Sequence, residues 1–216
     1  MHIVVFYQYF HSPDCPAAAR HYTFVREWSK RHRVTVITGN SWHNRRLSDQ
    51  FEWSPPGVDV RMLDIPYDNA MSFSHRLGSF SRFALGAVRT GLGVRTPDVI
   101  FGTSTPLSAA WAASRVARLR RVKWIFEVRD LWPDFPIQMG AIQNSLIKNS
   151  LRRMERKLYR SAAHVITLSP DMTDHVVRCG IGASAVTTIV NGTDLDLLET
   201  VSEQDVTELR QEHGLV

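Results

Sequence analysis

The sequence is poor in the features that mark several common classes of protein. Its 216 residues include only two cysteines, Cys15 and Cys179, which cannot build a disulfide framework. No run reaches the roughly 18 apolar residues that a membrane-spanning helix needs, and the start of the sequence lacks the charged segment of a signal peptide. We therefore expect a cytoplasmic protein, whose contact with the inner face of the cell membrane is at most peripheral.

Motifs for cofactors and metals are missing as well. The sequence has no GxGxxG dinucleotide fingerprint, no HExxH, and no histidine or cysteine spacing typical of zinc sites. The triplet Asp-Leu-Asp at 194–196 follows Asn-Gly-Thr. Asp194 is better explained as an N-cap or first-turn residue of a helix than as a metal ligand. We expect neither an essential metal nor a cofactor.

Lysine is scarce, and arginine supplies 22 of the 26 basic side chains. Residues 1–193 carry a net charge of +11, whereas residues 194–216 carry −6. A basic, arginine-rich body favours an anionic partner such as nucleic acid, a membrane surface or a phosphorylated ligand, although a compositional bias without function explains it equally well. Nucleic acid is the weakest of these candidates, because the sequence lacks the motifs of the common nucleic-acid-binding folds.

What the sequence does contain is an alternation of short apolar runs with helical patterns. The apolar runs predict strands at 2–7, 34–38, 58–63, 98–102, 123–128, 164–169 and 186–190. Helices are expected near 17–31, 70–94, 108–119 and 142–161, after 169 and in the acidic C-terminal segment. Continuously apolar strands alternating with helices predict an α/β fold with a Rossmann-like, doubly wound parallel sheet.

The most specific segment is EVRDLWPDFP at 127–136, directly after a predicted strand. Strand alternation puts Glu127 and Arg129 on one side and Asp130 near the mouth of the sheet. A carboxylate beside a guanidinium stays ionised and can accept a proton or orient a hydroxyl, and Trp132 offers a flat face for a sugar ring. The alternative is a structural Arg–Asp pair that closes the loop, with Trp132 packed beneath it.

The first loop offers a second set of candidates. Arg20 falls in the first turns of a predicted helix, where the backbone N–H groups can face a phosphate. His11 lies in the same loop. The alternatives are an ordinary helical arginine and a solvated histidine.

The stretch 71–95 combines large apolar side chains with four arginines and holds no acidic residue. Such a composition is typical of a helix on an anionic lipid surface. On this interpretation the residues facing the membrane are Phe73, Arg76, Phe80, Arg82 and Phe83. The alternative is an amphipathic helix packed on the core with a basic outer face.

The segments TPDVIFGTSTP, EVRDLWPD and IVNGTDLDLL together resemble the N-terminal domain of retaining glycosyltransferases of family 4, in particular a bacterial subgroup that makes O-antigen and capsule polysaccharides. The resemblance implies the N-terminal half of a GT-B fold, which binds the acceptor. It places Asp130 at the reaction centre and implies three further groups of residues: acceptor-binding Glu127, Arg129, Trp132, Asp134 and His11, donor-phosphate-facing Arg20, Asn191 and Gly192, and the membrane element above.

The same resemblance implies a division of the chain into an acceptor-side domain, 1–200, and the start of a linker, 201–216, toward a C-terminal donor domain. The expected partners are a nucleotide-sugar, a polyprenyl-diphosphate-linked sugar or polysaccharide acceptor, an anionic membrane and the donor domain in cis or in trans. Without that domain we expect no sugar transfer. Cys15 and Pro16 stand where the family commonly has two glycines. The alternative function is a non-catalytic module that binds a lipid-linked sugar or a partner protein.

Overall fold

The computed structural model describes residues 1–11, 19–41, 55–67, 70–104, 106–140, 142–192 and 202–214. Within these ranges, seven strands form one parallel sheet in the order β3-β2-β1-β4-β5-β6-β7. Their bounds are β1 His2–Phe6, β2 Arg33–Ser41, β3 Val58–Tyr67, β4 Val99–Thr103, β5 Lys123–Val128, β6 His164–Thr167 and β7 Val186–Thr188. The predicted doubly wound parallel sheet is thereby confirmed, and the strand order reverses between β1 and β4.

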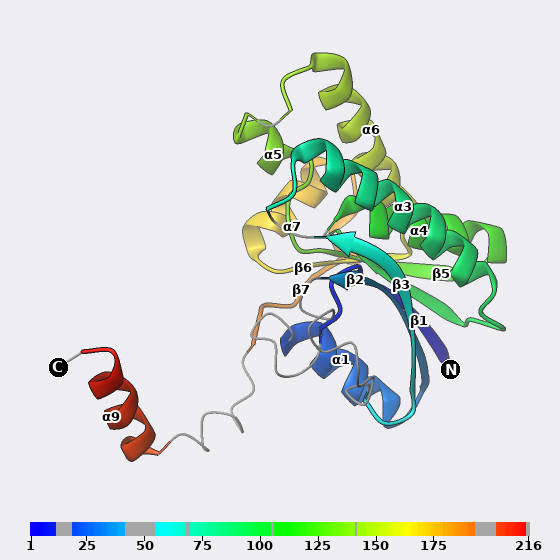
Figure 1. Ribbon diagram of the computed structural model, residues 1–216. Coiled ribbons are helices and arrows are strands. Elements are labelled where there is room, and N and C mark those ends of the chain that lie inside the picture. Colours follow the sequence, from blue (N-terminus) through cyan, green and yellow to red (C-terminus); the bar gives the residue numbers. More distant parts are fainter. Residues whose placement is uncertain are drawn as a thin grey trace.

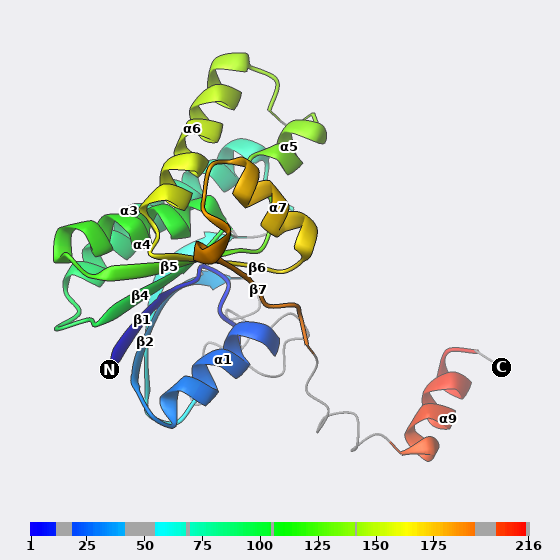
Figure 2. The same ribbon diagram turned by 180° about the vertical axis from the view of Figure 1, so that it is seen from behind.

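Helices cover both faces of this sheet (Figures 1 and 2). On one face lies α1 (Ala19–Ser29), which packs on a core cluster that includes Val5, Val36 and Phe101. On the other face lie α3 (Phe73–Leu92), α4 (Leu107–Arg120), α6 (Ser145–Ser161) and α7 (Pro170–Arg178) over the larger core cluster. Short elements complete the domain: α5 (Asp134–Gln138) and the 3₁₀ turn η2 (Ala183–Ala185).

The centre of the sheet is tightly packed because one strand position carries no side chain. A Cβ atom on Gly102 in β4 would lie 2.5 Å from the Cβ of Ala113 in α4. Helix α4 is rich in alanine, and Ala109, Ala110 and Ala113 are fully buried. These small residues let α4 lie close to β4 and fix the loop between them at the carboxyl edge of the sheet.

One expectation for the helices needs correction. Phe83 in α3 is fully buried in the larger core cluster, so its assignment to a membrane-facing set is wrong. The helix predicted near 142–161 is present as α6, which buries Leu158, whereas Leu146 and Ile147 in its first turn remain 78% and 51% exposed. That turn begins at Asn144, whose side chain caps the helix.

The acidic C-terminal helix is present as α9 (Glu203–Glu212), which is exposed along its length. A capping box between Ser202 and Asp205 starts it. Asp194 lies outside the described residues, as do Cys15 and Pro16. No helix in the described part of the chain has the length and apolar character needed to cross a membrane.

Candidate functional site

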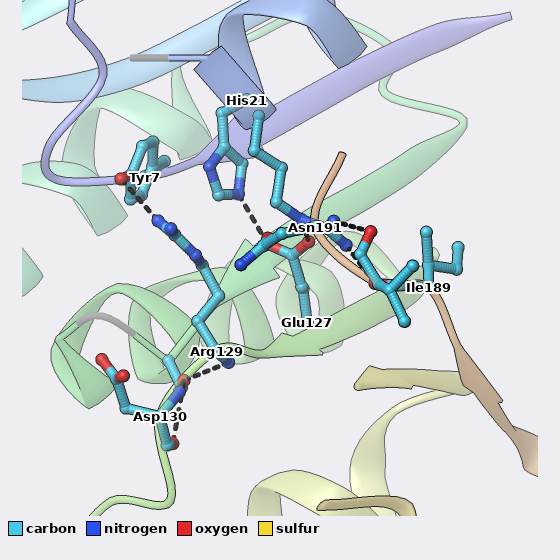
Figure 3. A network of polar contacts seen from close by, with 10 residues as sticks. Tyr7, His21, Glu127, Arg129, Asp130, Ile189 and Asn191 are labelled. Atoms are coloured by element: carbon cyan, nitrogen blue, oxygen red, sulfur yellow. Dashed lines mark hydrogen bonds and ion pairs between the residues drawn. The ribbon is translucent and has the colours of Figure 1, made fainter. Parts of the chain in front are cut away.

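The site lies at the carboxyl edge of the sheet, where the ends of β1, β4, β5 and β7 meet α1 (Figure 3). Ligands bind at this edge in open α/β sheets, beside the point where the strand order reverses. Glu127 is the penultimate residue of β5, and its side chain points to the α1 face. A polar network is built around it.

The carboxylate of Glu127 is the centre of this network. It is fully buried and accepts hydrogen bonds from Arg20 Nε at 2.9 Å and from His21 Nε2 at 2.6 Å. Burial alone raises the pKa of Glu127, but its interactions with His21 and Arg20 outweigh burial and hold the pKa below its usual value. Burial lowers the pKa of His21 against the opposing effect of Glu127. At neutral pH we therefore assign an ionised Glu127 and a neutral His21 that donates its Nε2–H.

Arg20 ties α1 to the end of the sheet. Besides Glu127, its guanidinium contacts the carbonyl oxygens of Ile189 (Nη2, 2.9 Å) and Val190 (Nη1, 2.8 Å) and the Oδ1 atom of Asn191 (3.4 Å). Its side chain is 8% exposed. The structure thus brings together Arg20 and Asn191, which the family resemblance groups with Gly192, and Gly192 is exposed next in the chain. Most of the guanidinium N–H groups already have partners within the chain.

Arg129 lies beside this cluster and donates from Nη1 to the hydroxyl of Tyr7 at 2.7 Å. The Tyr7 ring stacks on His21, with ring centroids 4.0 Å apart. Burial raises the pKa of Tyr7 although Arg129 opposes the rise, so the hydroxyl stays neutral and accepts the hydrogen bond. The Nε atom of Arg129 is buried and has no hydrogen-bond partner among the described residues.

Asp130 follows on a backbone that Ser104 holds in place. Ser104 Oγ accepts from the backbone N–H groups of Arg129 at 2.8 Å and Asp130 at 3.1 Å, and it donates to the Asp130 carbonyl at 3.2 Å. These bonds join the loops after β4 and β5. Asp130 is exposed, so its carboxylate reaches the mouth of the sheet from a fixed backbone. Such a group can orient a hydroxyl or accept its proton.

Two further sequence candidates, Trp132 and Asp134, make their contacts outside this network. Trp132 is half-buried on the side of α3, α4 and α6, where it packs against the larger core cluster. Asp134 begins α5 and forms an ion pair with Arg152 Nη2 at 2.9 Å. His11 is buried, 8% exposed. The carboxylate of Glu127, which the resemblance assigns to acceptor binding, is fully buried and enclosed by Arg20 and His21.

Three residues of the network were missed from the sequence: Tyr7, His21 and Ser104. Strand alternation was an available signal for Tyr7, which shares a face with Val5. His21 directly follows the predicted Arg20, and Ser104 directly follows the strand that ends at Thr103. Their joint role depends on contacts across 25 to 122 residues of sequence, which no local pattern reveals.

In the residues that the structure describes, no three His, Cys, Asp or Glu side chains form a group that could hold a metal ion. The positive charge at the site comes from Arg20 and Arg129.

Comparison with solved structures found several proteins of similar fold. The chain is similar to HepE from Anabaena, solved in complex with UDP and glucose: TM-score 0.65, 18% identity, 99% of this chain and 50% of that chain. It is also similar to Arabidopsis thaliana UGT89C1 complexed with quercetin (TM-score 0.51, 16% identity, 98% and 55% of the two chains). A UDP-GlcNAc 2-epimerase from Methanocaldococcus jannaschii gives a TM-score of 0.52, 9% identity and coverage of 88% and 45%.

These likenesses establish the Rossmann-like half of a GT-B fold, and the chain spans about half the length of these proteins. Comparison with curated proteins found no match. The family model of the glycosyl transferase 4-like domain matches residues 17–192, which include Arg20, Glu127, Asp130 and Asn191. The chain therefore belongs to the glycosyl transferase 4-like domain family.

Proposed function

We propose that this chain is the N-terminal, acceptor-binding part of a retaining glycosyltransferase, with Asp130 as its catalytic residue. The observation that carries the proposal is that Asp130 is exposed just after β5, on a backbone held by Ser104. Family membership supports the reaction class. The carboxylate would orient the acceptor hydroxyl and balance positive charge that develops at the sugar.

The arginines would serve the other half of the reaction, in which a phosphate leaves. Arg129 keeps a buried Nε–H without a partner among the described residues, so it has a donor to offer an incoming oxygen. Guanidinium groups match phosphate oxygens and need no metal to neutralise them. In this proposal Arg20, Asn191 and Gly192 face the donor phosphates, while Glu127 and His21 position Arg20. No cofactor or essential metal takes part.

The donor we propose is a UDP-hexose or UDP-hexosamine, supported by the UDP and UDP-glucose in the HepE structures. Residues 1–200 would form the acceptor domain and 201–216 the start of the connection to a donor domain, present in cis or in trans. The acceptor would be a polyprenyl-diphosphate-linked sugar or a polysaccharide such as O-antigen or capsule. The enzyme would work in the cytoplasm, with Arg76, Phe80 and Arg82 of α3 toward the membrane.

The test is sugar transfer by the chain reconstituted with a donor domain, comparing the wild type with Asp130→Asn. General acid–base and orienting carboxylates contribute about 100-fold or more to turnover, so we expect at least that loss. The free energy of unfolding should change by less than about 1 kcal/mol, because polar interactions of an exposed side chain contribute little. Asp174→Asn, an exposed acid on α7, is the matched control and should retain full turnover. Unchanged turnover in Asp130→Asn would refute the assignment.

A further inference from the structure

Helices α3, α4 and α6 lie on the same face of the sheet (Figure 1). Two hollows adjoin between these helices. The larger, of about 710 Å³, lies between α4 and α6. Four basic side chains and no acidic one are among the residues that line it: Arg115 and Arg118 from α4, and Arg153 and Lys157 from α6. We call it the basic cleft. Its charge fits a phosphate or another anion.

The smaller hollow, of about 340 Å³, lies between α3, the start of α4 and α6. Its lining is almost entirely apolar and includes Leu77, Phe80, Leu85, Trp132 and Leu151. We call it the apolar groove. Leu77 and Leu85 at its border are 55% and 67% exposed, and with the apolar lining they form a contiguous apolar patch of the kind that marks an interaction site.

The basic cleft and the apolar groove are neighbours, because Trp111 and Met154 line both. The guanidinium of Arg115 lies over the Trp111 ring, 5.1 Å from its centroid. A ligand can therefore place a charged group in the cleft and an apolar chain in the groove across one shared wall. A free anion would leave the groove empty, and an apolar peptide helix would leave four cations unpaired.

We propose that the basic cleft and the apolar groove together bind one anionic membrane lipid, with its phosphate among Arg115, Arg153 and Lys157 and an acyl chain along Leu77 and Leu85. Helix α3 contains three arginines and no acidic residue, which suits an anionic lipid surface around this site. The inference rests on the membrane contact in the proposed function, and it is independent of sugar transfer.

The test uses the 216-residue chain and vesicles of phosphatidylcholine with phosphatidylglycerol, measured by co-sedimentation. The double variant Arg153→Gln/Lys157→Gln removes two cleft charges. The control, Lys30→Gln/Arg31→Gln, removes two exposed charges at the end of α1 on the opposite face. Each basic residue at an anionic surface contributes about fivefold to partitioning. We expect the cleft variant to bind roughly 25-fold more weakly and the control variant to bind as the wild type does.

A second measurement tests where the acyl chain of the lipid lies. Phosphatidylglycerol brominated in its acyl chain should quench the tryptophan fluorescence of the wild type, and Trp111→Phe should lose part of that quenching. Replacing the exposed Leu85 by Ser should weaken binding without changing the midpoint of thermal unfolding, because Leu85 packs little in the fold. Glycerol phosphate without acyl chains should not compete with the vesicles.

Three results would overturn the proposal. Equal losses in the cleft and control variants would mean diffuse attraction, which leaves the membrane contact of α3 standing but removes the lipid site. Competition by glycerol phosphate would mean a site for soluble anions. Absence of vesicle binding would refute both the lipid site and the proposed membrane contact. Transfer to a water-soluble acceptor, tested with Asp130→Asn, reports on the catalytic proposal separately.

Discussion

Glu127→Gln tests whether the buried network holds the site together. The substitution keeps the shape of the side chain but removes the negative charge beside Arg20, which is only 8% exposed. Removing one partner of a buried ion pair costs about 3 to 5 kcal/mol. Arg20 keeps oxygen contacts to Ile189, Val190 and Asn191, so we expect the lower end, about 3 kcal/mol.

The assay is urea denaturation at neutral pH, followed by tryptophan fluorescence and circular dichroism. For a domain of this size the same loss lowers the midpoint of thermal unfolding by roughly 9 °C. Asp134→Asn is the control, because its ion pair with Arg152 is partly exposed and contributes less than about 1 kcal/mol. The reasoning is refuted if Glu127→Gln loses less than about 1 kcal/mol, or no more than Asp134→Asn.

Three further substitutions test the pKa assignment and the packing. The folded pKa of His21 lies below its unfolded value of about 6.5, so the unfolded state binds the proton first. The stabilising contribution of the neutral His21 is complete above that pH and is lost as the pH falls below it. In urea titrations between pH ~7 and ~5, the free energy of unfolding of His21→Gln should therefore decrease less than that of the wild type. Gly102→Ala should cost about 2 kcal/mol, since its Cβ would meet that of Ala113, and a thermal midpoint equal to the wild type would contradict this. Gly78→Ala in α3 meets no atom within 4 Å and should gain about 0.5 to 1 kcal/mol by the same assay.

The residues of α3 that were predicted to face a membrane show what the periodicity of a sequence does not predict. The composition of 71–95 predicts a helix that combines arginines with large apolar side chains, and α3 is that helix. Which of its aromatic residues face outward depends on the partner that covers each side. Phe83 is fully buried in the core, whereas Phe80 stacks on Tyr67 with ring centroids 5.5 Å apart. The local sequence predicts that a helix forms. It does not predict which face of the helix is buried when several apolar residues compete for burial.

The sequence by itself determined the sheet, because apolar runs of strand length between helical patterns have few other ways to bury both faces. It also placed Glu127, Arg129 and Asp130 at a strand end, where alternation along one chain segment is enough to separate their directions. Only the tertiary structure decided that Glu127 is enclosed by Arg20 and His21 while Asp130 stays exposed. Those contacts join residues more than 100 positions apart, and burial, charge pairing and the resulting pKa shifts exist only after distant strands and helices have packed.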